Sequence, residues 1–230
     1  MLRHGDFVTK AGLGDPVQCP LLTTEKSCSF GGHGAPEVGG IATHELLPLP
    51  MNDAMASHLA ERIRRAQDAL GIPMAVENVS SYARMPGSSM SEAEFVATVC
   101  ERADCRLLLD VNNVYVNSKN HGFDAREMIA ALPLDRVEQL HVAGHEQKPG
   151  GGLLDTHAEA VCEDVWNLLE WTLERTGPRP VLLERDGSFP AWAEVVREIR
   201  RCHEVADRAE RRRFGRVASK VSPNLECACP

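Results

Sequence analysis

Acidic, imidazole and amide side chains stand at the ends of several apolar stretches of this sequence. The stretches are Met74–Glu77, 107–112, 137–142 and 181–184. Polar groups at such positions are costly to bury unless something neutralises them, and a bound metal ion does so economically. The candidate metal ligands are Glu77, Asp110, Asn113, His141, Asp155, His157 and Glu184.

The ligand types narrow the choice of metal. Carboxylates, imidazoles and one amide without a thiolate suit iron, manganese or zinc better than magnesium or calcium, and they exclude a cysteine-rich structural zinc site. The number of candidates exceeds one coordination sphere, which indicates two or more ions bridged by a carboxylate. The spacings Asp110-x-x-Asn113 and Asp155-x-His157 each direct two side chains to one centre.

Each candidate also has a purely structural interpretation. Asp110 and Asn113 could hold a strand-to-helix loop, and His141 alone could be a hydrogen-bonded core histidine. Glu184 is followed by Arg185, so a local ion pair competes with the metal interpretation there. The shared position at strand ends favours the metal. His121 could reach over the strand ends from a loop, and we include it as a candidate catalytic contact to substrate.

The elements that must position these residues alternate between strands and helices. Strand starts near 74, 107, 137 and 181 are separated by amphipathic helical patterns, which is typical of βα units and a parallel sheet. Ser91 with Glu94 predicts a capping box, and Asp124 with Glu127 predicts another helix start. A doubly wound open sheet and a (β/α) barrel both fit, and active sites in such folds lie at the carboxyl ends of the strands.

Composition limits the class of protein. The chain has 230 residues, a formal net charge of −8 and 5% aromatic residues, which disfavours nucleic acid as a partner. No apolar stretch is long enough to span a membrane, and no secretory signal is visible, so we expect a cytoplasmic protein. Eight cysteines scattered over a chain of this length are expected to be mostly free thiols.

Seven segments together resemble the multinuclear non-haem iron-dependent oxidative enzymes, and most closely their bufferin-maturation branch. The similarity runs from about residue 45 to about residue 204. The segments are Glu77-Asn-Val-Ser-Ser-Tyr82, Met90-Ser-Glu-Ala-Glu-Phe95, Leu107-Leu-Leu-Asp-Val-Asn-Asn-Val-Tyr-Val-Asn117, Asn120-His-Gly-Phe-Asp124, His141-Val-Ala-Gly-His145, Leu153-Leu-Asp-Thr-His157 and Leu182-Leu-Glu-Arg-Asp186.

The resemblance implies a TIM barrel of the xylose-isomerase-like kind with two or three irons at its strand ends. It implies that dioxygen is used to oxidise cysteine residues of a ribosomally made precursor peptide, often delivered by a separate partner protein. By motif match, Glu77 would bridge two irons, Asp110 and Asn113 would be paired ligands, and His141, Asp155, His157 and Glu184 would complete the sites.

The start of the chain departs from that family. A strand ending in His-Gly is not found, and Lys26 stands where a ligand histidine is expected. We therefore predict an irregular segment 1–40, an incomplete barrel over 41–208 that binds fewer irons, and a basic, cysteine-containing tail over 209–230. Two alternatives to an active oxidase stay open. One is a truncated, non-catalytic member that binds a precursor or partner, and the other is a divalent-metal hydrolase or isomerase on the same scaffold.

Overall fold

The structure is a computed structural model that describes residues 37–38, 41–42 and 49–221, with side chains from 49 to 215. Lys26 and the packing of residues 1–36, within the segment expected to be irregular, lie outside the described residues. The described elements are β1 (Glu37–Val38), β2 (Ile41–Ala42), α2 (Asp53–Leu70), β3 (Ala75–Glu77), α3 (Glu92–Ala103), β4 (Arg106–Asp110), α4 (Val111–His121), α5 (Ala125–Ala131), η2 (Leu134–Arg136), β5 (Val137–Val142), β6 (Glu146–Gln147), β7 (Leu153–Leu154), α6 (Glu163–Thr176), β8 (Val181–Leu183) and α7 (Trp192–Val221).

The four strands predicted from apolar stretches are confirmed as one sheet of order β3-β4-β5-β8. The pairs β4–β5 and β5–β8 are both parallel, so their carboxyl ends lie at the same edge. Within the described residues the sheet is not seen to close into a barrel. What the structure shows is therefore an α/β fold with a parallel sheet and helices.

Asp110 is the last residue of β4 and also the N-cap of α4, because the strand passes directly into the helix. The prediction that Asn113 closes the strand was wrong: Asn112 and Asn113 lie in the first turn of α4. Leu107 and Leu109 are fully buried, and their apolar contacts fix the register of this strand. Asp110 pairs with His141 of β5 in that register.

The helix starts carry the side-chain caps that the sequence predicted. Ser91 and Glu94 form a reciprocal capping box at α3, and Asp124 accepts from two backbone N–H groups at α5. Such a cap contributes about 1 kcal/mol. Helix α2 ends at Gly71, whose φ of +68° is a backbone conformation that glycine adopts without strain.

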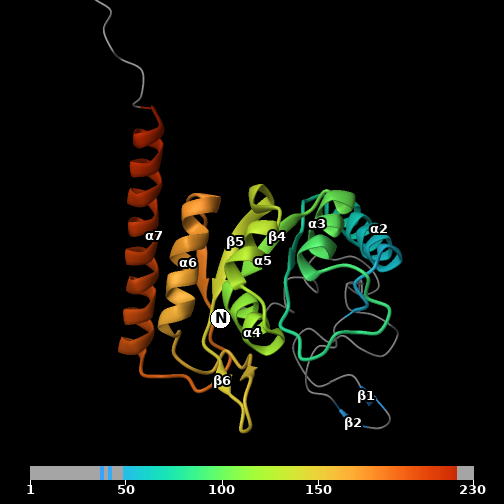
Figure 1. The fold of residues 1–230 in the computed structure, drawn as a ribbon, viewed down its shortest axis with the longest axis horizontal. Helices are drawn as coiled ribbons and strands as arrows, with labels where there is room; N and C mark the ends of the chain where they lie inside the picture. The colour runs from blue at the N-terminus through green and yellow to red at the C-terminus, as the bar shows by residue number, and fades with distance from the viewer. Residues whose placement is uncertain (1–36, 39–40, 43–48, 222–230) are drawn as a thin grey trace, which may run out of the picture. The chain divides into compact units, whose positions relative to one another are not determined.

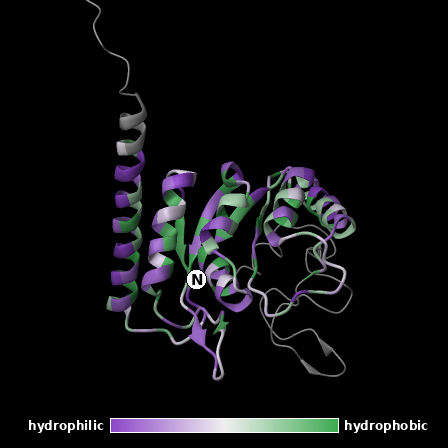
Figure 2. Cartoon of the chain, in the orientation of Figure 1, coloured by the Kyte–Doolittle hydropathy of each residue, from purple (hydrophilic) through white to green (hydrophobic). Residues whose placement is uncertain are grey.

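The chain forms two compact units. The first contains Met1–Val76 and Ser81–Arg106, where α2 packs against α3; the second contains Glu77–Ser80 and Leu107–Pro230. In the second unit α4 and α6 pack on β5, and α7 packs on α6 and β8 (Figure 1). Figure 2 shows that the helices of this unit are hydrophobic towards the strands and hydrophilic on their outer sides. All the ligand candidates belong to the second unit.

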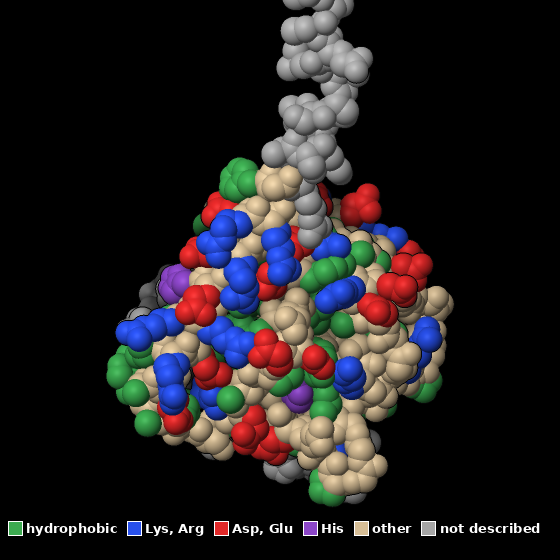
Figure 3. Space-filling view, turned by 60° about the vertical axis from the view of Figure 1, so that its left-hand side comes forward, with side chains coloured by type: hydrophobic (Ala, Val, Ile, Leu, Met, Phe, Trp, Pro, Cys, Tyr) green, Lys and Arg blue, Asp and Glu red, His purple; other side chains and the backbone are tan. Residues whose placement is uncertain are grey.

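Two buried carboxylates join α6 to α7. Glu170, only 5% exposed, lies 2.9 Å from both Arg208 and Arg212, and Glu174 lies 3.3 Å from Arg212. Figure 3 shows basic and acidic side chains interspersed on the face that carries α7. The helix continues through the residues where a tail was expected to begin at 209 and ends at Val221.

Two further expectations concern thiols and membranes. The cysteines whose side chains are described, which form no disulfide, are Cys100, Cys105, Cys162 and Cys202. No helix in the described part of the chain combines the length and apolar character needed to cross a bilayer.

Candidate metal centre

Three side chains on β3, β4 and β5 and a fourth that directly follows β8 meet at the carboxyl edge of the sheet. Glu77, Asp110, His141 and Glu184 each offer a ligand atom, and these atoms all lie within 4.8 Å of one another. His141 Nδ1 is 3.0 Å from Glu184 Oε2 and 3.4 Å from Glu77 Oε1. The parallel register explains the convergence, because Asp110 is opposite His141 and the Glu184 N–H donates to the Val142 carbonyl.

A second group shares Glu184 with the first. His157 and Asp186 join Glu184 with all three ligand atoms within 4.8 Å of one another. His157 Nδ1 lies 3.5 Å from both Glu184 Oε2 and Asp186 Oδ2. His157 has a φ of +48°, which is uncommon for a residue with a side chain and concentrates at functional sites. One carboxylate between two groups is the arrangement that can bridge two ions.

Several buried polar atoms of this cluster have no hydrogen-bond partner among the described residues. Asp110 Oδ2, Asn113 Oδ1, His141 Nδ1 and both ring nitrogens of His157 are in this position. The rings of His141 and His157 make ion-pair contacts with neighbouring carboxylates instead. Buried polar atoms are nearly always satisfied in native proteins, so these atoms fit the presence of a cation. Carboxylate, imidazole and amide donors together suit iron, manganese or zinc.

The pKa values of the metal-free cluster also indicate that its carboxylates require positive charge nearby. Burial raises the pKa of Asp110 to about 7. Burial opposes protonation of His141, but the nearby Glu184 and Glu77 outweigh it and raise the pKa to about 10. For His157, Asp155 likewise outweighs burial and raises the pKa to about 9. Without a metal, protons supply the positive charge that these carboxylates require.

Asparagine side chains hold the chain segment that carries Glu77. Asn78 exchanges two 2.9 Å hydrogen bonds with the backbone of Asp110, and so extends the strand ladder by a side chain. Asn113 Nδ2 donates to the Asn78 carbonyl at 3.0 Å, and Asn117 Nδ2 donates to the Val79 carbonyl at 3.0 Å. These buried amides fix the position of Glu77 relative to Asp110.

Asp155 is held in a second hydrogen-bonded chain. Asn112, which is fully buried, donates from Nδ2 to Asp155 Oδ1 at 2.7 Å and contacts His145 Nδ1 at 2.7 Å through Oδ1. His145 acts as the donor in that contact, because an amide oxygen only accepts. Asp155 Oδ1 in turn lies 2.8 Å from His157 Nε2. Asp155 therefore orients His157.

The structure brings most of the predicted ligands together. Glu77, Asp110, His141 and Glu184 share one group, His157 joins the second, and Asn113 and Asp155 are neighbours of these residues. His121 is not brought to the cluster. It ends α4, whereas Asp110 caps the start of that helix, and eleven helical residues rise about 16 Å.

Residues that the sequence analysis did not propose complete the site. Asp186 follows Glu184 at the strand period of two, which was a usable signal. Asn78 and Asn112 show no pattern of their own, because their roles depend on contacts between segments 32 and 43 residues apart.

The structure thus combines a parallel α/β sheet with a cluster of carboxylates and imidazoles at its carboxyl edge, whose ligand atoms are grouped closely enough for a metal ion. Residues 28–207 match the family described as the RiPP precursor modification enzyme MbnB/TglH/ChrH. The chain belongs to this family.

Individual relatives agree with the family assignment. A UPF0276 protein of Acinetobacter baylyi is 52% identical over 156 residues, which is 68% of this chain and 54% of that protein. A UPF0276 protein of Pseudomonas aeruginosa is 48% identical over 166 residues, covering 72% and 58%. One from Anaeromyxobacter is 48% identical over 186 residues, covering 81% and 63%. The chain thus spans little more than half the length of these relatives.

Proposed function

We propose that this chain carries the metal centre of an iron- and oxygen-dependent enzyme that oxidises cysteine residues of a ribosomally made precursor peptide, as in the bufferin-maturation branch. The observation that carries the proposal is the pair of buried, unpartnered oxygens, Asp110 Oδ2 and Asn113 Oδ1, beside two carboxylates and an imidazole. Membership of a family that modifies precursor peptides supplies the substrate class.

The residues present fit two metal positions. Glu77, Asp110 and His141 would hold one ion and His157 and Asp186 the other. Glu184, which belongs to both groups, would be the shared carboxylate in place of Glu77, the bridge that the resemblance implies. Bound iron would pass electrons from the peptide to dioxygen and would offer a binding position for the substrate thiolate. Asp155 would keep the His157 ring oriented, and Asn78 would keep Glu77 and Asp110 in place. For each dioxygen that is reduced to two water molecules, the peptide loses two pairs of hydrogen atoms, which supply all the electrons and protons.

The proposal extends to the longer relatives. A barrel completed by further strands would surround this edge of the sheet, and a separate partner protein would deliver the precursor. We place the protein in the cytoplasm, where reducing conditions keep substrate cysteines as thiols.

Co-expression with a cysteine-rich precursor peptide tests the proposal. We expect a mass loss of hydrogen atoms in pairs, located at cysteine by tandem mass spectrometry, that requires air and iron in the medium. The same co-expression with Glu184→Gln should leave the peptide unmodified, and Glu138→Gln, an exposed carboxylate on β5, serves as the matched control.

The alternatives predict different results. A non-catalytic member would bind less than one metal per chain and leave the peptide unchanged. A hydrolase or isomerase on this scaffold would be purified with zinc or manganese, and its activity would not depend on air. Either pattern would overturn the oxidase proposal.

A further inference from the structure

An ion pair between the segment after β8 and helix α7 lies beside the second metal group. Arg185 Nη2 donates to Glu198 Oε2 of α7 at 2.7 Å, and the two side chains are only 11% and 15% exposed. Glu184 and Asp186, on either side of Arg185, offer ligand atoms to the second group. Residue 185 between them turns to α7, as the strand period of two predicts. The pair is therefore next to the ligands without being one of them.

The same two side chains hold the loop of residues 155–161, which carries a ligand of the second group. Arg185 Nη1 donates to the Ala158 carbonyl at 2.7 Å, and Glu198 Oε1 accepts the Val161 N–H at 2.9 Å. Ala158 and Val161 are both buried, and buried backbone groups need partners of this kind. The ion pair thus attaches the loop at two points.

The position of His157 depends on this loop. The Asp186 N–H donates to the His157 carbonyl at 2.9 Å, which joins the loop to the segment after β8 next to the ligands. His157 has a φ of +48°, and such a conformation persists only where surrounding contacts maintain it. The loop also packs so closely on Gly144 that a side chain there would collide with the Glu159 carbonyl. The loop is thus confined by Gly144 and by the ion pair.

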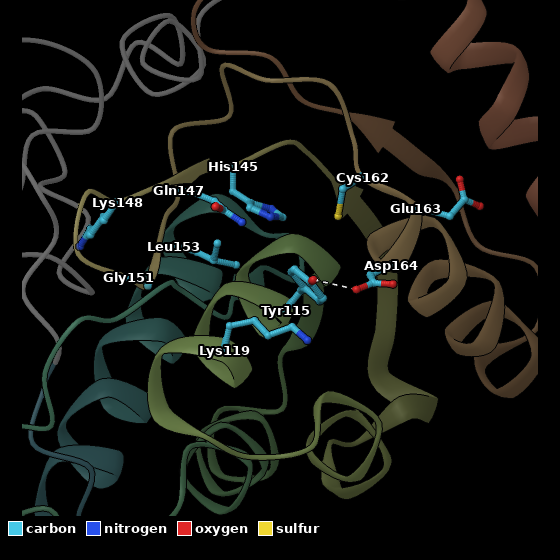
Figure 4. A pocket seen from close by; sticks show the side chains of 11 residues that line it. Tyr115, Lys119, His145, Gln147, Lys148, Gly151, Leu153, Cys162, Glu163 and Asp164 are labelled. Carbon is cyan, nitrogen blue, oxygen red and sulfur yellow. Dashed lines mark hydrogen bonds between the residues drawn. The ribbon is translucent and has the colours of Figure 1, made fainter.

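Helix α6, which follows the loop, is anchored by other contacts. Figure 4 shows its start, where Asp164 Oδ2 accepts from the Tyr115 hydroxyl at 2.9 Å in the wall of a pocket of about 610 Å³. The Trp166 indole N–H donates to the Val161 carbonyl at 3.0 Å. We therefore expect a change at the ion pair to displace the part of the loop near His157 without detaching α6.

We propose that Arg185 and Glu198 position His157 for the second metal ion by holding its loop. The inference rests on the two metal positions of the proposed function. It concerns the second position alone, because the proposed ligands of the first all come from the strand ends. Glu184, the shared ligand, is held separately by its backbone hydrogen bond to Val142. The first ion should therefore stay bound when the pair is broken.

A purely electrostatic role of Arg185 predicts the opposite result. A guanidinium beside a cation site repels the metal ion, so removing it would tighten metal binding. A positioning role predicts weaker binding, because loss of a residue that orients a ligand costs about ten- to hundredfold in metal affinity. Arg185→Met removes the charge and the hydrogen bonds, whereas Arg185→Lys keeps the charge but lacks the fork that reaches both acceptors.

The test measures ferrous iron bound to the full chain without oxygen, with stoichiometry from elemental analysis and affinity from competition with a chelator. We expect two ions in the wild type. The second ion should bind about tenfold more weakly or worse in Arg185→Met, and Arg185→Lys should be intermediate. Arg208→Met is the matched control, since the same substitution removes another α7 arginine from a buried carboxylate, that of Glu170, and it should keep both ions.

Hydrogen exchange of the metal-free protein gives a readout that does not depend on metal. Arg185→Met should exchange faster than the wild type in peptides that cover 156–161, while peptides that cover β5 keep their protection and so report an intact fold. Glu198→Gln keeps an oxygen for the Val161 N–H and should have the smaller effect. Arg208→Met should leave exchange in 156–161 unchanged.

The possible outcomes separate this inference from the proposed function. Unchanged or tighter binding of the second ion in Arg185→Met, or unchanged exchange of the loop, would overturn the inference alone. An equal loss of the second ion in Arg208→Met would do the same, because lowered stability would then explain the effect. A wild-type chain that binds fewer than two ions would contradict the two metal positions of the proposed function and the inference with them.

Discussion

Asp110 uses its two carboxylate oxygens differently. Oδ1 accepts the Asn113 N–H at 2.8 Å and caps α4, whereas Oδ2 is buried without a partner. These two roles can be separated by substitution. An asparagine keeps an acceptor for the cap and loses the negative charge, while an alanine loses both.

We predict that Asp110→Asn remains folded but lowers metal content by about tenfold or more, since loss of even a supporting residue of a metal site costs that much. Asp110→Ala should lose the metal and also about 1 kcal/mol of unfolding free energy from the missing cap. Elemental analysis and urea denaturation measure the two effects. Full metal content in Asp110→Asn would show that Oδ2 is not a ligand.

The pH dependence of stability is the second prediction at this scale. In the metal-free protein the pKa values of Asp110, His157 and His141, at about 7, 9 and 10, lie above their ordinary values. The folded state therefore binds more protons than the unfolded state. The resulting stability is complete at low pH and is lost as pH rises through these values.

The melting temperature of chelator-treated protein should accordingly fall between pH 6.5 and pH 10, by about 2–4 °C for each kcal/mol lost. The decline should be shallower in His141→Gln. Added metal should reduce it as well, because metal binds the deprotonated ligands. A melting temperature that rises over this interval would contradict the assignment.

At the scale of elements, the sequence predicted strands and helix caps well because both depend on local pattern. The strand 137–142 and the Ser91 capping box were predicted from neighbouring residues alone. The short β6–β7 hairpin was not predicted, since two-residue strands carry no periodicity. Asn113 was placed on the strand rather than the helix because nothing local shows that β4 passes into α4 without a loop.

The attachment of α7 to α6 gives a prediction at this scale. Glu170→Ala leaves Arg208 without its buried partner, whereas Arg212 keeps its 3.3 Å contact with Glu174. Because both arginines are partly exposed, we expect a loss of about 1–3 kcal/mol rather than the larger cost of a fully buried pair. The exposed Glu194–Arg197 pair is the control, and Glu194→Ala should cost less than about 0.5 kcal/mol. Equal denaturation midpoints for the two variants would contradict this account.

At the scale of the whole molecule, the convergence of the site could be predicted but its supporting contacts could not. Parallel strands bring their carboxyl ends to one edge wherever they lie in the order, so Glu77, His141 and Glu184 could be grouped from sequence. The contacts of Asn112 with Asp155 and His145 depend on the segments that flank the β6–β7 hairpin meeting α4, which is a non-local event. Closure of a barrel likewise depends on contacts between distant parts of a chain. The chain spans 54–63% of the length of the relatives described above.

The most direct test of the account is the metal content of the full chain purified without oxygen. Iron per chain should reach at least one in the wild type and fall to a small fraction in Glu184→Gln, which removes the carboxylate shared by both groups. The exposed Glu138→Gln should retain the wild-type content. A wild-type protein that folds yet takes up no ferrous iron, even when iron is supplied in excess, would contradict the claim that these strand ends form a metal centre.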